Sequence, residues 1–90
     1  MAVNDFLKII AMPTILLIRG FRFFFWSNEN EEPIHIHVEK GDAEGKIWLM
    51  PNIQVAYLHG FTKKEGKAII KIITENILLL QRSWYDYFEQ

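Results

Sequence analysis

The chain has 90 residues, of which 50% are hydrophobic and 14% aromatic, with a formal net charge of −1 and no cysteine. A chain of this length forms one domain that buries only about 60 to 65% of its unfolded surface, so one dense core is expected. The nearly balanced charge excludes the strongly basic class of nucleic-acid binders. The lack of cysteine excludes disulfides and thiolate metal sites.

The first quarter of the chain is apolar enough to raise the question of a membrane span. A spanning helix needs about 20 consecutive, mostly apolar residues, and this stretch is interrupted by Lys8, Pro13, Arg19, Gly20 and Arg22. The sequence also lacks the small-residue cleavage pattern of a secretory signal. We therefore expect a cytoplasmic protein without membrane contact. Residues 1–11 form an N-terminal extension that could hold a short helix, and residues 12–90 form a single domain.

The middle of the chain predicts a mostly antiparallel meander of four or five strands. The candidate strands are β-branched or aromatic runs between turn residues: TILLI (14–18), FRFFFWS (21–27), IHIHVEK (34–40), KIWLM (46–50) and IQVAYL (53–58). Gly20 marks a bulge or a sharp bend, so the first two runs fit either one bent strand or two. Polar segments at 28–33 and 41–45 are typical of the connecting loops.

The C-terminal third changes to a helical period. Thr62 and Glu65 form a capping box that starts a helix at Lys63. Apolar residues then recur every three or four positions: Ile69, Ile72, Ile73, Ile77, Leu80, Trp84 and Tyr87 or Phe88. Continued to Phe88, the helix is about 39 Å long at 1.5 Å per residue, so it should bend or overhang a small sheet. The predicted fold is α+β, with the meander under one long C-terminal helix.

The second predicted strand is apolar on both faces. Phe21, Phe23 and Phe25 point to one side, and Phe24 and Trp26 point to the other. The helix covers one face only, and large exposed apolar patches commonly mark protein contacts. We therefore expect a homodimer or a partner protein on the second face.

Two histidines stand one residue apart in the third strand. Alternation places His35, His37 and Glu39 on one face and Ile34, Ile36 and Val38 on the other, which is the core face. Histidines two apart on a strand are about 6.5 to 7 Å apart at the backbone, a spacing at which both can bind one metal ion. The pair therefore forms the first candidate site.

A metal site at this pair needs a third ligand from another segment. His59 is the only other histidine, and the carboxylate candidates are Glu29, Glu31, Glu32, Asp42 and Glu44. A divalent metal is thus possible, although no cofactor is certain.

Three other roles of the pair stay open. The rings could face solvent or pack on aromatic neighbours, or they could form a partner-binding surface that responds to pH. They could also act as acid and base on a phosphodiester, with Arg22 or Lys40 stabilising charge. Separately, Arg19 and Arg22 flank Gly20 and could hold an anion.

The chain resembles a bacterial family known as domain of unknown function 4160. The resemblance spans residues 12–88 and is carried by MPTI (12–15), GFRFFFWSNE (20–29), EPIHIHVEKGD (32–42), IWLMP (47–51), HGF (59–61), ENILLL (75–80) and WYDYF (84–88). The histidine pair is the hallmark of this family, which implies a role for His35 and His37. Family genes often lie beside another small gene and are sometimes labelled toxin–antitoxin-like.

The resemblance and the second apolar face together favour protein binding. We expect one component of a small two-gene, toxin–antitoxin-like module whose partner is encoded by the neighbouring gene. The alternative is a metal-dependent or histidine-based ribonuclease or phosphodiesterase that uses His35 and His37. Nucleic acid is expected only as the substrate of that alternative.

Overall fold

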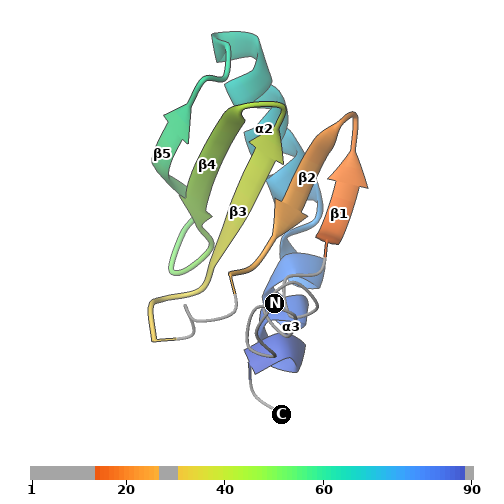
Figure 1. Ribbon diagram of the computed structural model, residues 1–90. Coiled ribbons are helices and arrows are strands. Elements are labelled where there is room, and N and C mark those ends of the chain that lie inside the picture. Colours follow the sequence, from red (N-terminus) through yellow and green to blue (C-terminus); the bar gives the residue numbers. More distant parts are fainter. Residues whose placement is uncertain (1–13, 27–30, 89–90) are drawn as a thin grey trace, which may run out of the picture.

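The computed structural model describes residues 14–26 and 31–88, which form a five-stranded sheet with two helices on one side (Figure 1). The strands are β1 (Thr14–Ile18), β2 (Phe21–Phe24), β3 (His35–Lys40), β4 (Ala43–Trp48) and β5 (Gln54–His59). The helices are α2 (Lys63–Glu75) and α3 (Ile77–Phe88). The predicted α+β class is confirmed, whereas the predictions for residues 1–13 and for Glu29 lie outside the described residues.

The sheet is a simple meander in which each strand pairs with the next. The strand order is β1-β2-β3-β4-β5, and all four pairings are antiparallel. The turn between β1 and β2 consists of Arg19 and Gly20, with φ angles of 55° and 84°. Two consecutive residues with positive φ are typical of the tight hairpin turns that match the twist of a sheet. The first two apolar runs are therefore two strands and not one bent strand.

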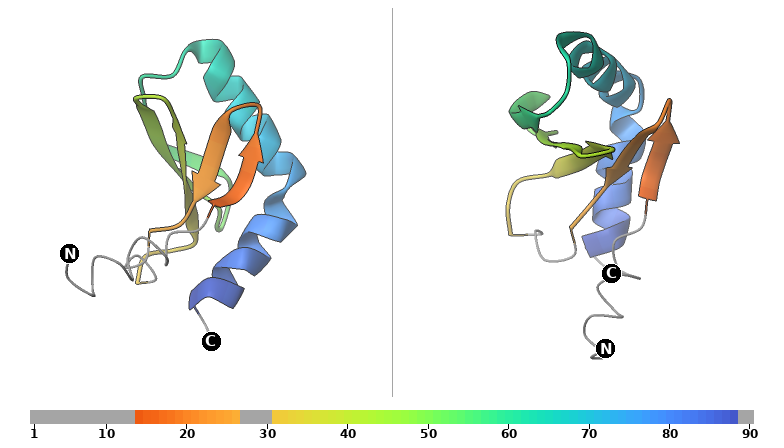
Figure 2. Two further views of the ribbon diagram at one scale, coloured as in Figure 1. Left: turned by 45° about the vertical axis from the view of Figure 1, so that its right-hand side comes forward. Right: turned by 45° about the horizontal axis from the view of Figure 1, so that its top comes forward.

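The C-terminal helix is broken, so the prediction of one long helix is wrong in this respect. Asn76 has φ −122° and ψ 19°, and its side-chain Nδ2 donates to the Ile72 carbonyl at 2.8 Å. The backbone N–H of Asn76 also bonds to the carbonyls of Ile72 and Ile73. This local bonding ends α2, as asparagine does when its side chain competes for helix carbonyls. The expected bend lies here, and α3 runs on past the ends of the strands (Figure 2).

The helices cover one face of the sheet and form the core with it. Glu65 and Thr62 bond reciprocally at 2.9 and 3.0 Å, which confirms the capping box. The predicted apolar stripe of the helices lies on the sheet as expected, with buried members Ile69, Ile72, Ile73, Leu80 and Trp84. They pack on the inward residues of the strands, including Phe21, Phe23, Phe25, Ile36, Val38 and Ile47. We call this side of the sheet the helix face.

A glycine allows β5 to lie close to β4. A Cβ at Gly45 would be 2.5 Å from Leu58 Cδ2 and 3.0 Å from the Tyr57 carbonyl oxygen. The first distance is shorter than real Cβ contacts and the second is tight, so a larger residue at this position of β4 would require Leu58 and the adjacent backbone of β5 to shift. Neither of the helices in the described part of the chain is long and apolar enough to cross a membrane.

Candidate functional site: the histidine face

The register of the sheet confirms that His35 and His37 project together from β3. Residues opposite each other in an antiparallel pair share a face of the sheet. Phe24, His37, Lys46 and Tyr57 are paired in one row across four strands, and His35 lies opposite Trp48 in the next row. We call this side, opposite the helix face, the histidine face. Its described residues include Arg22, Phe24, Trp26, His35, His37, Glu39, Lys46, Trp48 and Tyr57.

The two imidazole rings contact each other and are enclosed by aromatic rings. Their centroids are 5.2 Å apart and the ring planes meet at 81°. His37 stacks on Phe24 at 5.7 Å and meets the edge of Trp26 at 6.0 Å. Both neighbours come from β2 or from the residues directly after it, where the FRFFFW run supplies aromatic side chains to both faces.

His35 is enclosed by rings from two other elements. Trp48 of β4 lies 5.5 Å away and Trp84 of α3 lies 5.1 Å away, measured between ring centroids. As a result, His35 is 0% exposed and His37 is 6% exposed. The sequence left two arrangements open for imidazoles without a chemical role, which were exposure to solvent and packing on aromatic neighbours. The structure has the second arrangement.

One nitrogen of His35 has a defined protonation state. Nδ1 lies 2.9 Å from the carbonyl oxygen of Pro33. A carbonyl oxygen can only accept, so Nδ1 carries a proton and donates it. The other nitrogen, Nε2, is 3.7 Å from Glu32 Oε2, which is too long for a hydrogen bond. In the neutral ring Nε2 is therefore an acceptor, and an ion pair with Glu32 requires the imidazolium.

Glu32 is bound more closely by a lysine. The Nζ atom of Lys46 donates to both carboxylate oxygens of Glu32 at 2.9 and 3.2 Å. The same ammonium lies 4.5 Å from the centroid of the Trp48 ring, at a cation–π distance. This pair adds charged groups to the aromatic layer around the two imidazoles.

A second charged pair lies at the β2–β3 side of this face. Arg22 donates from Nη1 to Glu39 Oε1 at 2.8 Å and from Nε to Thr14 Oγ1 at 2.7 Å. Its guanidinium lies 4.3 Å from the centroid of the Phe24 ring. The outermost aromatic group is Trp26, which is 42% exposed.

Arg22 and Lys40, the predicted charge-stabilising residues, lie on opposite faces of the sheet, and the anion site of Arg19 and Arg22 stays a prediction. Arg22 lies on the histidine face and is bound to Glu39. Lys40 points to the helix face, where its Nζ is 3.6 Å from Glu65 and 4.8 Å from the Phe21 ring. The Lys40 side chain packs beside Gly20, the residue that follows Arg19 in the turn.

The structure also does not bring His59 to the histidine pair. His59 lies in β5, two strands from β3, and is paired with Glu44 of β4. The centroid of its ring is 4.8 Å from that of Tyr57. Across residues 14–26 and 31–88, no group of three or more histidine, aspartate or glutamate side chains is arranged to hold a metal ion. A metal at His35 and His37 thus stays a prediction without a third ligand among these residues.

Sequence reasoning missed five residues that lie around the pair. The sequence predicts Phe24 and Trp26 on the second face but in no site, and it does not predict Lys46, Trp48 or Trp84 beside the histidines. The pairing of His35 with Trp48 and of His37 with Lys46 follows from the short turn at 41–42, so hairpin register was an available signal. Trp84 had no such signal, because its position depends on how the helix breaks at Asn76.

Comparison with protein families agrees with the resemblance carried by these motifs. The model of a family described as Domain of unknown function (DUF4160) matches residues 20–85, which include all of β2 to β5, all of α2 and most of α3. Comparisons with curated proteins and with solved structures found no match.

Proposed function

We propose that this chain, which belongs to the DUF4160 family, binds a second protein through its histidine face, as one component of a two-gene, toxin–antitoxin-like module. The observation that supports this proposal is the composition of the face. It combines aromatic rings with two charged pairs on the side of the sheet opposite the helices, which α3 reaches through Trp84 beside His35 (Figures 1 and 2).

The residue types on this face are those that dominate protein interfaces. Tryptophan, tyrosine and arginine are enriched among the residues that contribute most to binding energy. Trp26 is 42% exposed, whereas Phe24 and His37 beneath it are 5% and 6% exposed. The indole therefore rests on a packed base, and a side chain that is held in place before binding loses little entropy when the partner arrives.

The burial of the histidines favours this function over the enzymatic alternative. A general acid or base must come within about 2.6 to 3.2 Å of the substrate atom with which it exchanges a proton. His35 is 0% exposed and its Nδ1 donates to Pro33, so it has no path to a substrate in this arrangement. The pair instead supports the base of the proposed binding surface.

The test is co-expression with the product of the neighbouring gene, followed by calorimetric titration of the purified proteins. Trp26→Ala should weaken the complex about 30-fold or more, the effect of losing one interface hot spot. Leu78→Ala is the matched control, because Leu78 is 79% exposed on α3, away from the histidine face. This variant should bind within about 3-fold of the wild type, as residues outside an interface do.

Two outcomes would overturn the proposal. One is the absence of a complex at micromolar concentrations, and the other is equal weakening by both variants. If His37→Ala abolishes RNA cleavage by the purified protein and Trp26→Ala leaves it intact, the enzymatic alternative is correct instead.

A further inference from the structure

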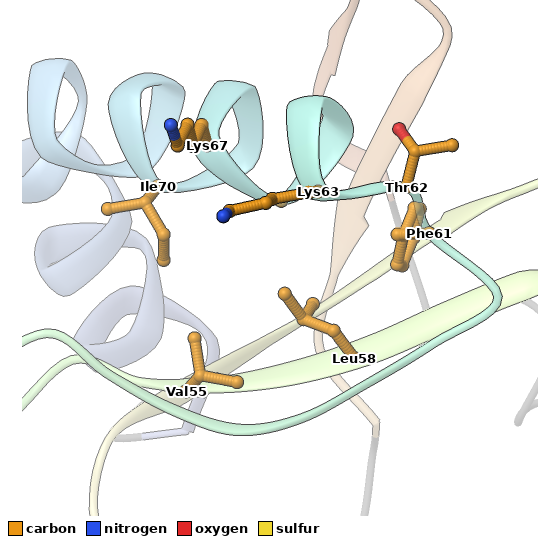
Figure 3. Close-up of a pocket in the computed structure, with 8 residues that line it drawn as sticks. Val55, Leu58, Phe61, Thr62, Lys63, Lys67 and Ile70 are labelled. Carbon is orange, nitrogen blue, oxygen red and sulfur yellow. The ribbon is translucent and has the colours of Figure 1, made fainter.

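A second surface lies on the other side of β5, between this strand and α2. It is an open groove of about 560 Å³ with a mostly apolar lining (Figure 3). The lining residues are Val55, Leu58, Phe61, Thr62, Lys63, Gly66, Lys67 and Ile70. The groove belongs to the helix face, so the sheet separates it from the histidine face.

The groove depends on a glycine inside a helix. Gly66 lies in the first half of α2, where glycine is less favourable than alanine because it leaves the unfolded chain more freedom. A Cβ at Gly66 would have one close neighbour, Leu58 Cδ1, at an ordinary contact distance of 3.4 Å. Neither packing nor backbone conformation therefore requires glycine here. Its structural effect is to keep the groove open.

The rim of the groove is cationic. Lys63, Gly66, Lys67 and Ile70 follow each other at three- and four-residue spacing, so they share one face of α2. In Figure 3 the ammonium of Lys63 extends over the space between Ile70 and Leu58. Within the described residues, neither Lys63 nor Lys67 takes part in an ion pair. The nearby Glu65 is directed away, toward Lys40.

The shape of the groove favours a segment of protein over a small ligand. Small-molecule sites bury about 70 to 90% of the ligand, whereas this groove is open along its length and one lining residue, Val55, is itself 42% exposed. A helix laid along the groove would cover Val55 as well as the space below Gly66. Recognition of a helix in an apolar groove is a common mode of protein binding.

Two further features select the kind of segment. β5 is an edge strand whose register shifts between Lys46 and Ile47, so that Ala56 has no partner in β4. Such a bulge in an edge strand discourages the addition of another strand. A second copy seated groove to groove would bring the lysines of both copies together, which like charges oppose. The remaining occupant is a helix from another protein with acidic residues beside its apolar stripe.

We propose that the groove between β5 and α2 binds an amphipathic helix of a partner protein, whose apolar residues enter beneath Gly66 and whose carboxylates pair with Lys63 and Lys67. This proposal does not depend on the one for the histidine face, because the two surfaces share no residue.

The test is a selection from a phage library of random 16-residue peptides on the full-length protein, with counter-selection on Gly66→Leu. The leucine fills the groove and also favours the helix, so the melting temperature of this variant should rise by about 4 to 8 °C. Loss of binding therefore cannot come from unfolding. Enriched peptides should have apolar residues three and four apart, flanked by aspartate or glutamate.

An enriched peptide is then measured by fluorescence anisotropy on matched variants. Gly66→Leu and the double variant K63E/K67E should each weaken binding at least 10-fold. Gly66→Ala, which adds one methyl group, should weaken it much less. K64E/K71E makes the same change in net charge on α2 outside the groove and should stay within 3-fold of the wild type.

Three outcomes would overturn this proposal. The first is that the wild type and Gly66→Leu enrich the same peptides, or that the wild type enriches no peptide relative to Gly66→Leu. The second is a set of peptides that lack acidic residues or bind K63E/K67E as well as the wild type. The third is a dimer of the wild-type protein in sedimentation that Gly66→Leu dissociates, which would assign the groove to a second copy of this chain. None of these outcomes bears on binding at the histidine face.

Discussion

The two faces of the sheet are built from the same strands but from different chemistry. On the helix face, Phe23, Ile36 and Ile47 are 0% exposed and belong to the hydrophobic core that the sheet forms with the helices. On the histidine face, the buried groups are two imidazoles surrounded by indoles and charged pairs. Because side chains alternate along a strand, β3 contributes to both faces at once. The helix face can therefore supply stability while the histidine face carries the proposed binding surface.

The largest expected effect is on the helix face. Ile36→Ala removes a fully buried aliphatic side chain between the sheet and the helices, and such changes destabilise proteins by about 2 to 5 kcal/mol. The free energy of unfolding from urea denaturation measures this loss. A loss below about 1 kcal/mol would mean that the helix face is not the main source of stability. This result would contradict the contrast drawn between the helix face and the histidine face.

A smaller effect is expected from the histidine face, where the ring should matter more than its nitrogens. His35→Ala leaves a space between Trp48 and Trp84 and should cost about 2 to 4 kcal/mol. His35→Phe keeps an aromatic ring and loses the hydrogen bond to Pro33, so it should cost about 1 kcal/mol. Urea denaturation of both variants tests this order. Equal losses would show that the nitrogens of His35, rather than its packing, hold this face together.

The smallest effect is expected at Tyr87, on α3. Its hydroxyl is buried and has no hydrogen-bond partner among the described residues. Burial raises the pKa of Tyr87 above its ordinary value of 10.0. The stability that this group contributes is therefore complete below pH 10.0 and is lost as pH rises through the pKa of the folded state.

Tyr87→Phe should accordingly change stability by less than about 1 kcal/mol at neutral pH and should reduce the alkaline loss. Melting temperatures between neutral pH and about pH 11 measure both effects. Tyr85→Phe is the control, because Tyr85 is exposed on the same helix. An equal gain in alkaline stability from both variants would contradict the role assigned to burial at Tyr87.

The parts of the fold that depend on local patterns could be predicted from the sequence. Alternation in IHIHVEK gave the two faces of β3, and the capping box at Thr62 gave the start of α2. The apolar stripe gave the side on which the helices pack. The break at Asn76 could not be predicted, because the apolar period continues across it and asparagine is only mildly unfavourable in a helix.

The candidate site was predicted in part for a related reason. The sequence places His35 and His37 side by side, but their burial depends on Trp26, Trp48 and Trp84, which come from three separate segments. Whether distant rings converge on one point is a property of tertiary packing that a local pattern does not encode. The same holds for His59, whose distance from the pair depends on the number of strands between them.

The contact between His35 and Trp84 has a consequence for synthesis on the ribosome. All five strands pair with their immediate neighbours, so every hairpin can form soon after its second strand emerges. Residue 84, however, lies in α3 and leaves the exit tunnel only after all five strands. A nascent or prematurely terminated chain that lacks the end of α3 would hold the complete sheet but leave His35 without its closest indole. Completion of the aromatic layer around His35 thus requires α3 as well as the sheet.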